Sequence, residues 1–246
     1  MRKLINVDNF VRFVFLTFLA STVYVIIRLI LAPSVAPSSD YAVLIKGDYI
    51  VLLLECIFGV VAMLLPGFLA RRIRLSIPSA MILAYAAFIY CAIFLAEVRR
   101  FYITVPHWDT ILHTFSGIAI GALGFSIVSI LNDSDTTAFT LSPFFVALFA
   151  FCFALAIGVI WEFYEFTMDS LFDWNMQTYA LESGEPFIGQ AALVDTMKDL
   201  IVDAVGALVI SVVGYYSLKK NRIWLKRFQI TWMDSDSEGV AVSKRK

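Results

Sequence analysis

Residues 143–167 read PFFVALFAFCFALAIGVIWEFYEFT, an apolar run whose only charged side chains, Glu162 and Glu165, come near its end. A helix needs roughly 20 mainly apolar residues to cross the hydrocarbon core of a bilayer. This run is long enough, and five other stretches of the chain resemble it. The sequence therefore predicts an all-α integral membrane bundle of about six helices.

The predicted spans account for most of the chain. They are Phe10–Leu31, Tyr49–Ala70, Ile77–Val98, Trp108–Leu131, Pro143–Thr167 and Leu193–Leu218. Composition agrees, because 60% of the residues are hydrophobic and 16% are charged, which is too apolar for a soluble domain. We expect residues 1–218 to form one transmembrane domain and residues 219–246 to form a polar, partly disordered cytoplasmic tail.

Lysine and arginine are biased toward one side of the predicted bundle. That side carries Arg2, Lys3, Arg71, Arg72, Arg74, Lys219, Lys220, Arg222, Lys226 and Arg227. The other side carries Arg28, Lys46, Arg99, Arg100 and Lys198. The more basic side faces the cytoplasm in multi-pass proteins. We therefore predict a multi-pass protein of the cell membrane with both termini in the cytoplasm and two longer loops, Ala32–Asp48 and Met168–Ala192, facing outward.

Acidic residues gather in the predicted outer halves of three spans. At 100° per residue, each group lies on one helical face. The three stripes are Asp109 with His113, then Glu162, Glu165 and Asp169, then Asp195, Asp199 and Asp203. An ionised carboxylate in hydrocarbon costs several kcal/mol, so intramembrane acids usually face the protein interior or water. The pattern predicts that the stripes face one another in a shared site.

The charge in this leaflet requires compensation by protons or cations. With Glu55 and Glu97 included, carboxylates outnumber the nearby basic side chains. Oxygen ligands favour Mg²⁺ or Mn²⁺, and one imidazole among them also permits Zn²⁺. We predict a divalent metal ion bound by Asp109, His113, Glu162, Glu165, Asp169, Asp195, Asp199 and Asp203. His113, Asp109 and Glu165 are the catalytic candidates, with His113 as a ligand or general base.

Simpler roles compete for the individual residues. A single acid near a helix end is often interfacial, which is an alternative for Asp169 and Glu97. An ion pair between Glu55 and Arg28, at similar depth, is the default expectation for those two. Asp195 has a capping alternative. Gly117 and Gly121 form a small-residue pair that suits close helix packing.

Four segments carry a family resemblance: EVRRFY at 97–102, WDTILHTFSG at 108–117, WEFYE at 161–165 and DTMKDLIVDAVGA at 195–207. In this order they resemble the YjdF-like family of bacterial and archaeal membrane proteins. The arrangement is also distantly similar to VanZ-like proteins. The resemblance implies no established activity. It supports a motif core of Asp109, His113, Glu162, Glu165, Asp195 and Asp199.

Three functions remain open from the sequence. The first is a metal-dependent hydrolase or transferase acting on a lipid or lipid-linked substrate that enters from the outer leaflet. The second is a cation or proton-coupled transporter, although the apolar inner halves of the spans argue against an open conduit. The third is a non-catalytic protein that binds a cation or lipid headgroup. Membrane lipids are the expected partners, and nothing indicates nucleic-acid binding or an oligomeric state.

Overall fold

The computed structural model describes residues 6–35, 44–132, 141–181, 183–220 and 228–233. Six helices are long and apolar enough to cross a membrane. In chain order the elements are α1 Val7–Leu31, α2 Lys46–Arg72, β1 Leu75–Ser76, α3 Ser79–Ile89, η1 Tyr90–Val98, α4 Phe101–Thr104, α5 Trp108–Asn132, α6 Pro143–Phe172, η2 Gly189–Leu193, α7 Val194–Lys219 and β2 Thr231–Trp232. The predicted all-α membrane bundle is confirmed. The largest difference is in α6, which continues five residues beyond Thr167 to Phe172.

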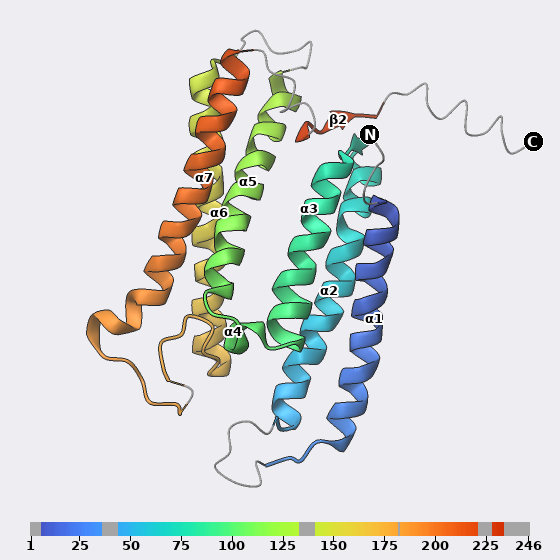
Figure 1. Ribbon diagram of the computed structural model, residues 1–246, viewed down its shortest axis with the longest axis vertical. Helices are drawn as coiled ribbons and strands as arrows, with labels where there is room; N and C mark the ends of the chain where they lie inside the picture. Colours follow the sequence, from blue (N-terminus) through green and yellow to red (C-terminus); the bar gives the residue numbers. More distant parts are fainter. Residues whose placement is uncertain (1–5, 36–43, 133–140, 182, 221–227, 234–246) are drawn as a thin grey trace, which may run out of the picture.

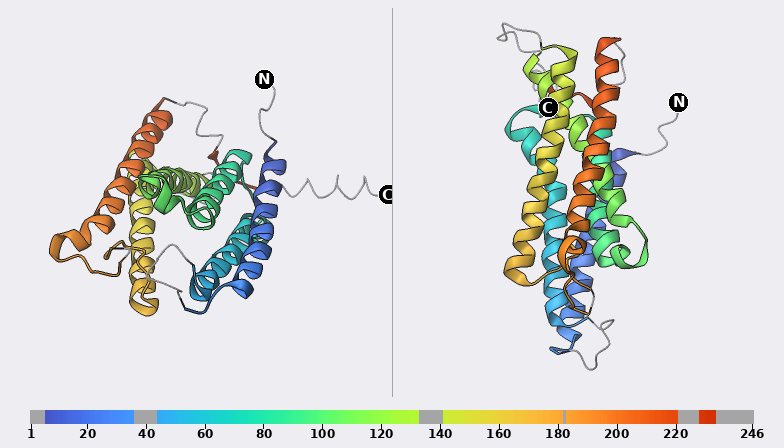
Figure 2. Two further views of the ribbon diagram at one scale, coloured as in Figure 1. Left: turned by 60° about the horizontal axis from the view of Figure 1, so that its bottom comes forward. Right: turned by 90° about the vertical axis from the view of Figure 1, so that its left-hand side faces the viewer.

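The long helices form two sets of three that run along the same axis (Figures 1 and 2). One set contains α1, α2 and α3, which continues without a break as the π-helix η1, and the other contains α5, α6 and α7. The sets touch where α3 and η1 meet α5. Each has an apolar core, with Phe18, Ala62 and Ile89 in the first and Phe125 and Ala150 in the second.

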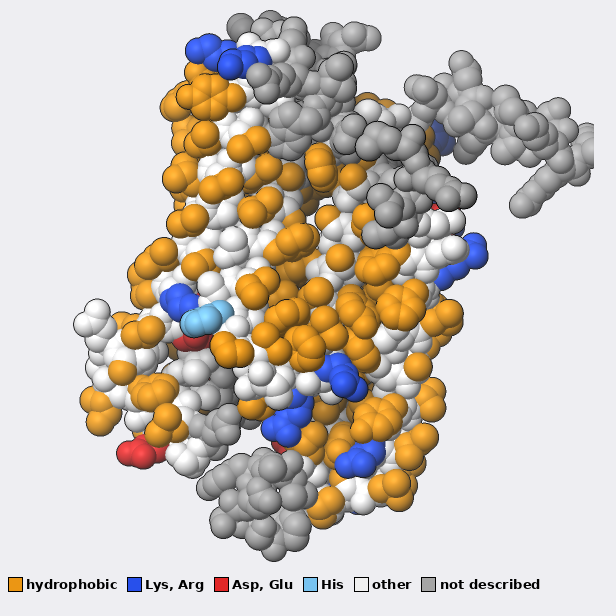
Figure 3. Space-filling view, in the orientation of Figure 1, with side chains coloured by type: hydrophobic (Ala, Val, Ile, Leu, Met, Phe, Trp, Pro, Cys, Tyr) orange, Lys and Arg blue, Asp and Glu red, His pale blue; other side chains and the backbone are white. Residues whose placement is uncertain are grey.

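Large apolar side chains cover the outside of the helices. Leu54, Phe58 and Val61 on α2 and Phe163 and Phe166 on α6 are all exposed. Figure 3 shows hydrophobic side chains along the helices, with basic side chains gathered toward their two ends. A water-soluble surface rarely exposes apolar area on this scale, whereas a surface in contact with lipid does. The surface therefore supports the assignment as a membrane protein.

A short irregular segment joins the two sets. Arg100 follows η1 with a φ of 56°, in the left-handed region, and α4 begins at the next residue. His107 has a φ of 59° and directly precedes α5. These two reversals turn the chain at the end of η1, place Arg100 beside the first set of helices and start α5 at Trp108.

The segment after α7 is ordered in part. Thr231–Trp232 pairs in antiparallel register with Leu75–Ser76, and the backbone N–H of Ile230 donates to Ser126 Oγ at 2.6 Å. The chain at 228–233 thus contacts α5 and the α2–α3 connection, which belong to different sets of helices. The sequence did not predict this contact. The predicted disorder at 234–246 lies outside the described residues.

Candidate metal centre

The acidic stripes meet because each lies on the part of its helix that is at the same end of the bundle. The beginning of α5, the end of α6 and the beginning of α7 all lie at that end, since the helices alternate in direction (Figure 1). Gly117 on α5 and Gly206 on α7 bring the backbones close. A Cβ at Gly117 would lie 2.6 Å from the carbonyl oxygen of Asp203, and one at Gly206 would lie 2.6 Å from that of Thr114. The predicted close packing at Gly117 is confirmed.

His113 is held between two carboxylates. Its Nδ1 lies 3.3 Å from Asp203 Oδ2, and its Nε2 lies 3.7 Å from Asp109 Oδ1. Ser116 Oγ donates to the other oxygen of Asp203 at 3.0 Å. With Nδ1–H donating to Asp203, a neutral imidazole keeps its lone pair on Nε2, which faces Asp109. A carboxylate behind a histidine is the usual means of orienting a metal-binding ring.

Among the described residues, Asp109, His113 and Asp199 form a group whose ligand atoms could hold a metal ion. One ligand atom from each lies within 4.8 Å of the others. Ions such as Zn²⁺ or Mn²⁺ bind such atoms at about 2.1 Å, which places ligands roughly 3–4 Å apart. A contraction of about 1 Å would therefore bring all three into contact with one ion. The Asp109 side chain is 31% exposed, so the group is accessible from one side.

Two buried carboxylate oxygens in this region have no hydrogen-bond partner among the described residues. They are Asp199 Oδ1 and Glu162 Oε1. Asp199 is 2% exposed and Glu162 is 4% exposed. A buried acceptor without a partner costs roughly 1–3 kcal/mol, and more when it is charged. A bound cation or proton at these oxygens would remove that cost, so they point to a ligand at the centre of the site.

The two glutamates on α6 have different neighbours. Gln177 Nε2 donates to Glu162 Oε2 at 3.2 Å and also contacts Thr196 Oγ1 at 3.0 Å. Trp161 Nε1 donates to Glu165 Oε1 at 2.8 Å. Gln177 lies in the loop after α6 and was not predicted as a site residue. No sequence pattern marks it, because its place depends on how the loop folds back over the site.

Asp169 organises that loop. Its two oxygens accept the backbone N–H groups of Met176 at 2.8 Å and Gln177 at 3.0 Å. The side chain of Asn175 then binds the backbone of Ala180 twice. Its Nδ2 donates to the Ala180 carbonyl oxygen, and its Oδ1 accepts from the Ala180 N–H. Asp169 is buried on the same face of α6 as Glu162 and Glu165, but its oxygens are already engaged. We infer that Asp169 positions Gln177, whose side chain in turn contacts Glu162.

Asp195 and Lys198 complete the electrostatic surroundings. Asp195 is half-buried and interacts electrostatically with Asp109 and Asp199. Lys198 interacts with the same two carboxylates and is attractive to both. A single lysine offsets only part of the charge of several neighbouring carboxylates. The remaining charge favours uptake of a cation or of protons.

The expected ion pair between Arg28 and Glu55 is wrong. Arg28 Nε donates instead to Tyr49 Oη at 3.0 Å, and its guanidinium lies over the Tyr49 ring. Glu55 Oε2 is a buried oxygen with no hydrogen-bond partner within the residues that the structure describes. Glu55 interacts electrostatically with Glu97 on η1, so these two acids lie near each other between α2 and η1. Arg28 therefore contacts α2 at Tyr49, six residues before Glu55, rather than at Glu55 itself.

A family model described as "Predicted membrane protein (DUF2238)" matches residues 10–220, from the beginning of α1 to the end of α7. The chain belongs to this family. The match covers all six long helices and every residue of the candidate site. The resemblance to YjdF-like proteins is consistent with it, whereas the resemblance to VanZ-like proteins receives no support. No curated protein and no solved structure matches the chain.

Proposed function

We propose that this protein binds one divalent metal ion through Asp109, His113 and Asp199 and acts as a metal-dependent hydrolase or transferase on a lipid or lipid-linked substrate. The observation that carries the proposal is the buried Asp199 Oδ1, which has no hydrogen-bond partner in the described part of the chain and lies near an imidazole whose Nδ1 is engaged by Asp203. Two carboxylates and one imidazole suit Zn²⁺ or Mn²⁺, and Mg²⁺ remains compatible.

The protein residues have separate roles in this proposal. Asp203 orients the His113 ring, and Ser116 orients Asp203. Glu165 and Glu162 lie on the neighbouring helix, where either carboxylate can accept a proton from water or from a substrate hydroxyl. A metal at the site would polarise a phosphoryl or acyl oxygen or acidify a bound water molecule. The exposed edge of Asp109 leaves access for substrate. Three protein ligands and an open position are the pattern of catalytic zinc sites.

We further propose that the site faces outward. Among the described residues, Arg71, Arg72, Arg74, Lys219 and Lys220 lie at the end of the bundle opposite the site. Labelling with a membrane-impermeant maleimide tests this orientation in intact cells. In a cysteine-free background, Gly184→Cys in the loop after α6 is expected to react and Arg72→Cys is expected to be protected. The reverse labelling would contradict the orientation.

Metal content is the first test of the site. The protein purified in uncharged detergent without chelator is expected to hold about one Zn²⁺ or Mn²⁺ per chain by elemental mass spectrometry. Asp199→Asn is expected to lose it, because the amide removes the charge and weakens the ligand. Glu185→Gln, an exposed acid in the loop, is the matched control and is expected to retain the metal. Absence of metal from the parent protein, with no stabilisation when metal is added, would refute the proposal.

Turnover separates an enzyme from a binding protein. The metal-loaded protein is incubated with lipid extract in nanodiscs, and new products are sought by mass spectrometry. Products that require Asp199 support catalysis. If the protein retains metal but converts neither phosphorylated nor acylated lipids, it binds a cation without catalysing a reaction.

Cation or proton transport is the second candidate, favoured by one observation. Acidic side chains and Tyr102 connect the proposed metal centre with the other set of helices. Tyr102 interacts electrostatically with Asp109, Glu165, Glu97 and Glu55. Reconstituted vesicles with an internal pH-sensitive dye would show proton movement that Glu55→Gln abolishes if this candidate holds. No movement in vesicles that contain metal-loaded protein would exclude it.

A further inference from the structure

A cavity at the same end of the bundle shares no residue with the metal centre. Its volume is about 490 Å³, within the range of roughly 300–1,000 Å³ that is typical of small-molecule sites. It lies between the end of α1, the beginning of α2 and the turn after η1. The residues that line it are Arg28, Leu31, Ala32, Pro33, Leu44, Tyr49 and Arg100.

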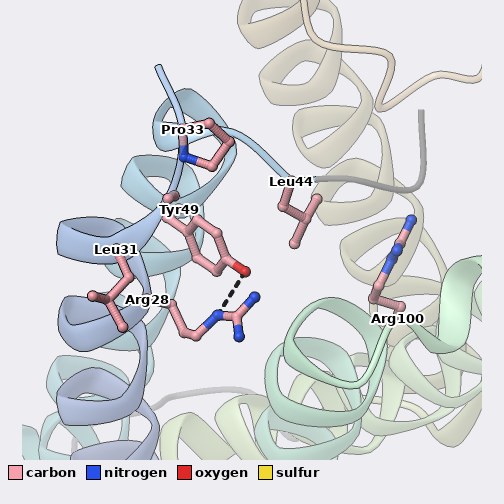
Figure 4. A pocket seen from close by; sticks show the side chains of 7 residues that line it. Arg28, Leu31, Pro33, Leu44, Tyr49 and Arg100 are labelled. Carbon is pink, nitrogen blue, oxygen red and sulfur yellow. Dashed lines mark hydrogen bonds between the residues drawn. The ribbon is translucent and has the colours of Figure 1, made fainter. Parts of the chain in front are cut away.

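Two arginines approach the cavity from opposite walls (Figure 4). The hydroxyl of Tyr49 accepts a hydrogen bond from Arg28 Nε, and among the described residues the terminal nitrogens of that guanidinium have no hydrogen-bond partner, so they can bind a ligand. The left-handed backbone at Arg100 places the second guanidinium across the cavity. Within the described part of the chain, neither group pairs with a carboxylate. An arginine presents a planar fork of donors that matches phosphate oxygens.

Apart from Tyr49 and the two arginines, the lining residues are apolar, and part of this lining is exposed on the surface of the bundle. Leu31 is 74% exposed at the last turn of α1, and Leu44 and Pro33 face the cavity. The cavity lies where α1 ends and α2 begins, and the ends of spans lie at the depth of lipid headgroups. A ligand held here would thus present an anionic group to the arginines and an apolar group to the membrane.

We propose that this cavity binds the phosphate group of an anionic phospholipid. Arg28 and Arg100 hold the phosphate oxygens, Tyr49 fixes the Arg28 side chain, and the acyl chains lie along α1 beside Leu31. Because none of these residues binds the metal, this binding is independent of the proposed enzymatic function.

The test compares phosphatidic acid with diacylglycerol of the same acyl chains. Purified protein in uncharged detergent, with chelator present, is titrated with each lipid, and bound lipid is counted by native mass spectrometry. One phosphatidic acid per chain is expected, with no saturable binding of diacylglycerol. Arg28→Gln with Arg100→Gln is expected to weaken binding at least tenfold. The loss of one hydrogen bond between charged groups typically lowers affinity by about tenfold or more.

Two further variants keep the result interpretable. Arg12→Gln with Arg72→Gln removes two exposed arginines at the other ends of α1 and α2 and is expected to change binding less than about twofold. Leu44→Trp keeps both guanidinium groups but fills the cavity, and is expected to weaken binding. It also serves if the arginine double variant fails to fold.

Three outcomes would overturn the proposal. The first is equal binding of phosphatidic acid by the parent protein and by both the arginine and Leu44→Trp variants. The second is equal binding of diacylglycerol. The third is displacement of the lipid by equimolar inorganic phosphate. That result would mean that the cavity recognises phosphate, but that its ligand is not a phospholipid. The same titration in Asp199→Asn is expected to match the parent, so failure of the metal proposal and failure of this one remain distinguishable.

Discussion

Replacing Gly206 by alanine tests the helix contact on which the proposed metal centre depends. A Cβ at this position would lie 2.6 Å from the carbonyl oxygen of Thr114 on α5. Ordinary contact begins near 3.4 Å, so α5 and α7 would have to separate by about 0.8 Å. The obstacle is backbone, and no side-chain rotation can relieve it. Overpacking of this kind typically costs about 1–3 kcal/mol.

The matched control is Gly67→Ala in α2. A Cβ there meets nothing closer than the end of the Arg71 side chain at 3.9 Å. Both substitutions gain about 1 kcal/mol from helix propensity. That gain cancels when the two variants are compared, so Gly206→Ala is expected to be about 1–3 kcal/mol less stable than Gly67→Ala.

The separation should also affect the site. Moving α7 away by about 0.8 Å would lengthen the 3.3 Å contact between His113 Nδ1 and Asp203 Oδ2 to about 4 Å, beyond hydrogen-bond range. Thermal unfolding in detergent measures the stability, and elemental mass spectrometry measures the metal. Equal unfolding temperatures for Gly206→Ala and Gly67→Ala, with equal metal content, would refute the close contact between α5 and α7.

Three further substitutions probe separate contacts. Asp203→Asn is expected to lower metal affinity by about 10- to 100-fold in competition with a chelating dye, because the imidazole loses its orienting carboxylate; unchanged affinity would contradict that role. Asp169→Ala should speed limited proteolysis of the loop at 173–193 while metal content persists, and a loop as resistant as the parent's would exclude Asp169 as its organiser. Ser126→Ala leaves the amide of Ile230 unpaired and should cost about 1–3 kcal/mol in thermal unfolding. Ser211→Ala is its control, since that buried hydroxyl has no hydrogen-bond partner in the described ranges, and equal stability of the two variants would argue against the contact at Ser126.

The periodicity of single helices predicted much of the site. Glu162 and Glu165 recur at helical spacing, so one face of the fifth span had to avoid lipid. His113 and Asp203 occur in equivalent stripes, and the structure brings them within hydrogen-bond distance. Such patterns identify which face of a helix is polar. They do not specify the axial rotation and depth at which two helices meet, and so could not separate the proposed metal ligands from the residues proposed to position them.

The sequence by itself determined the six apolar spans and the opposite directions of successive spans. The cost of exposing polar backbone groups to lipid leaves few other structures open to such a chain. Only the tertiary structure decided which residue Arg28 binds, that Asp169 holds a loop, and that residues 228–233 pair with the α2–α3 connection. These contacts join positions far apart in the chain. Their strength depends on distances and directions of hydrogen bonds, which local composition and hydropathy do not encode.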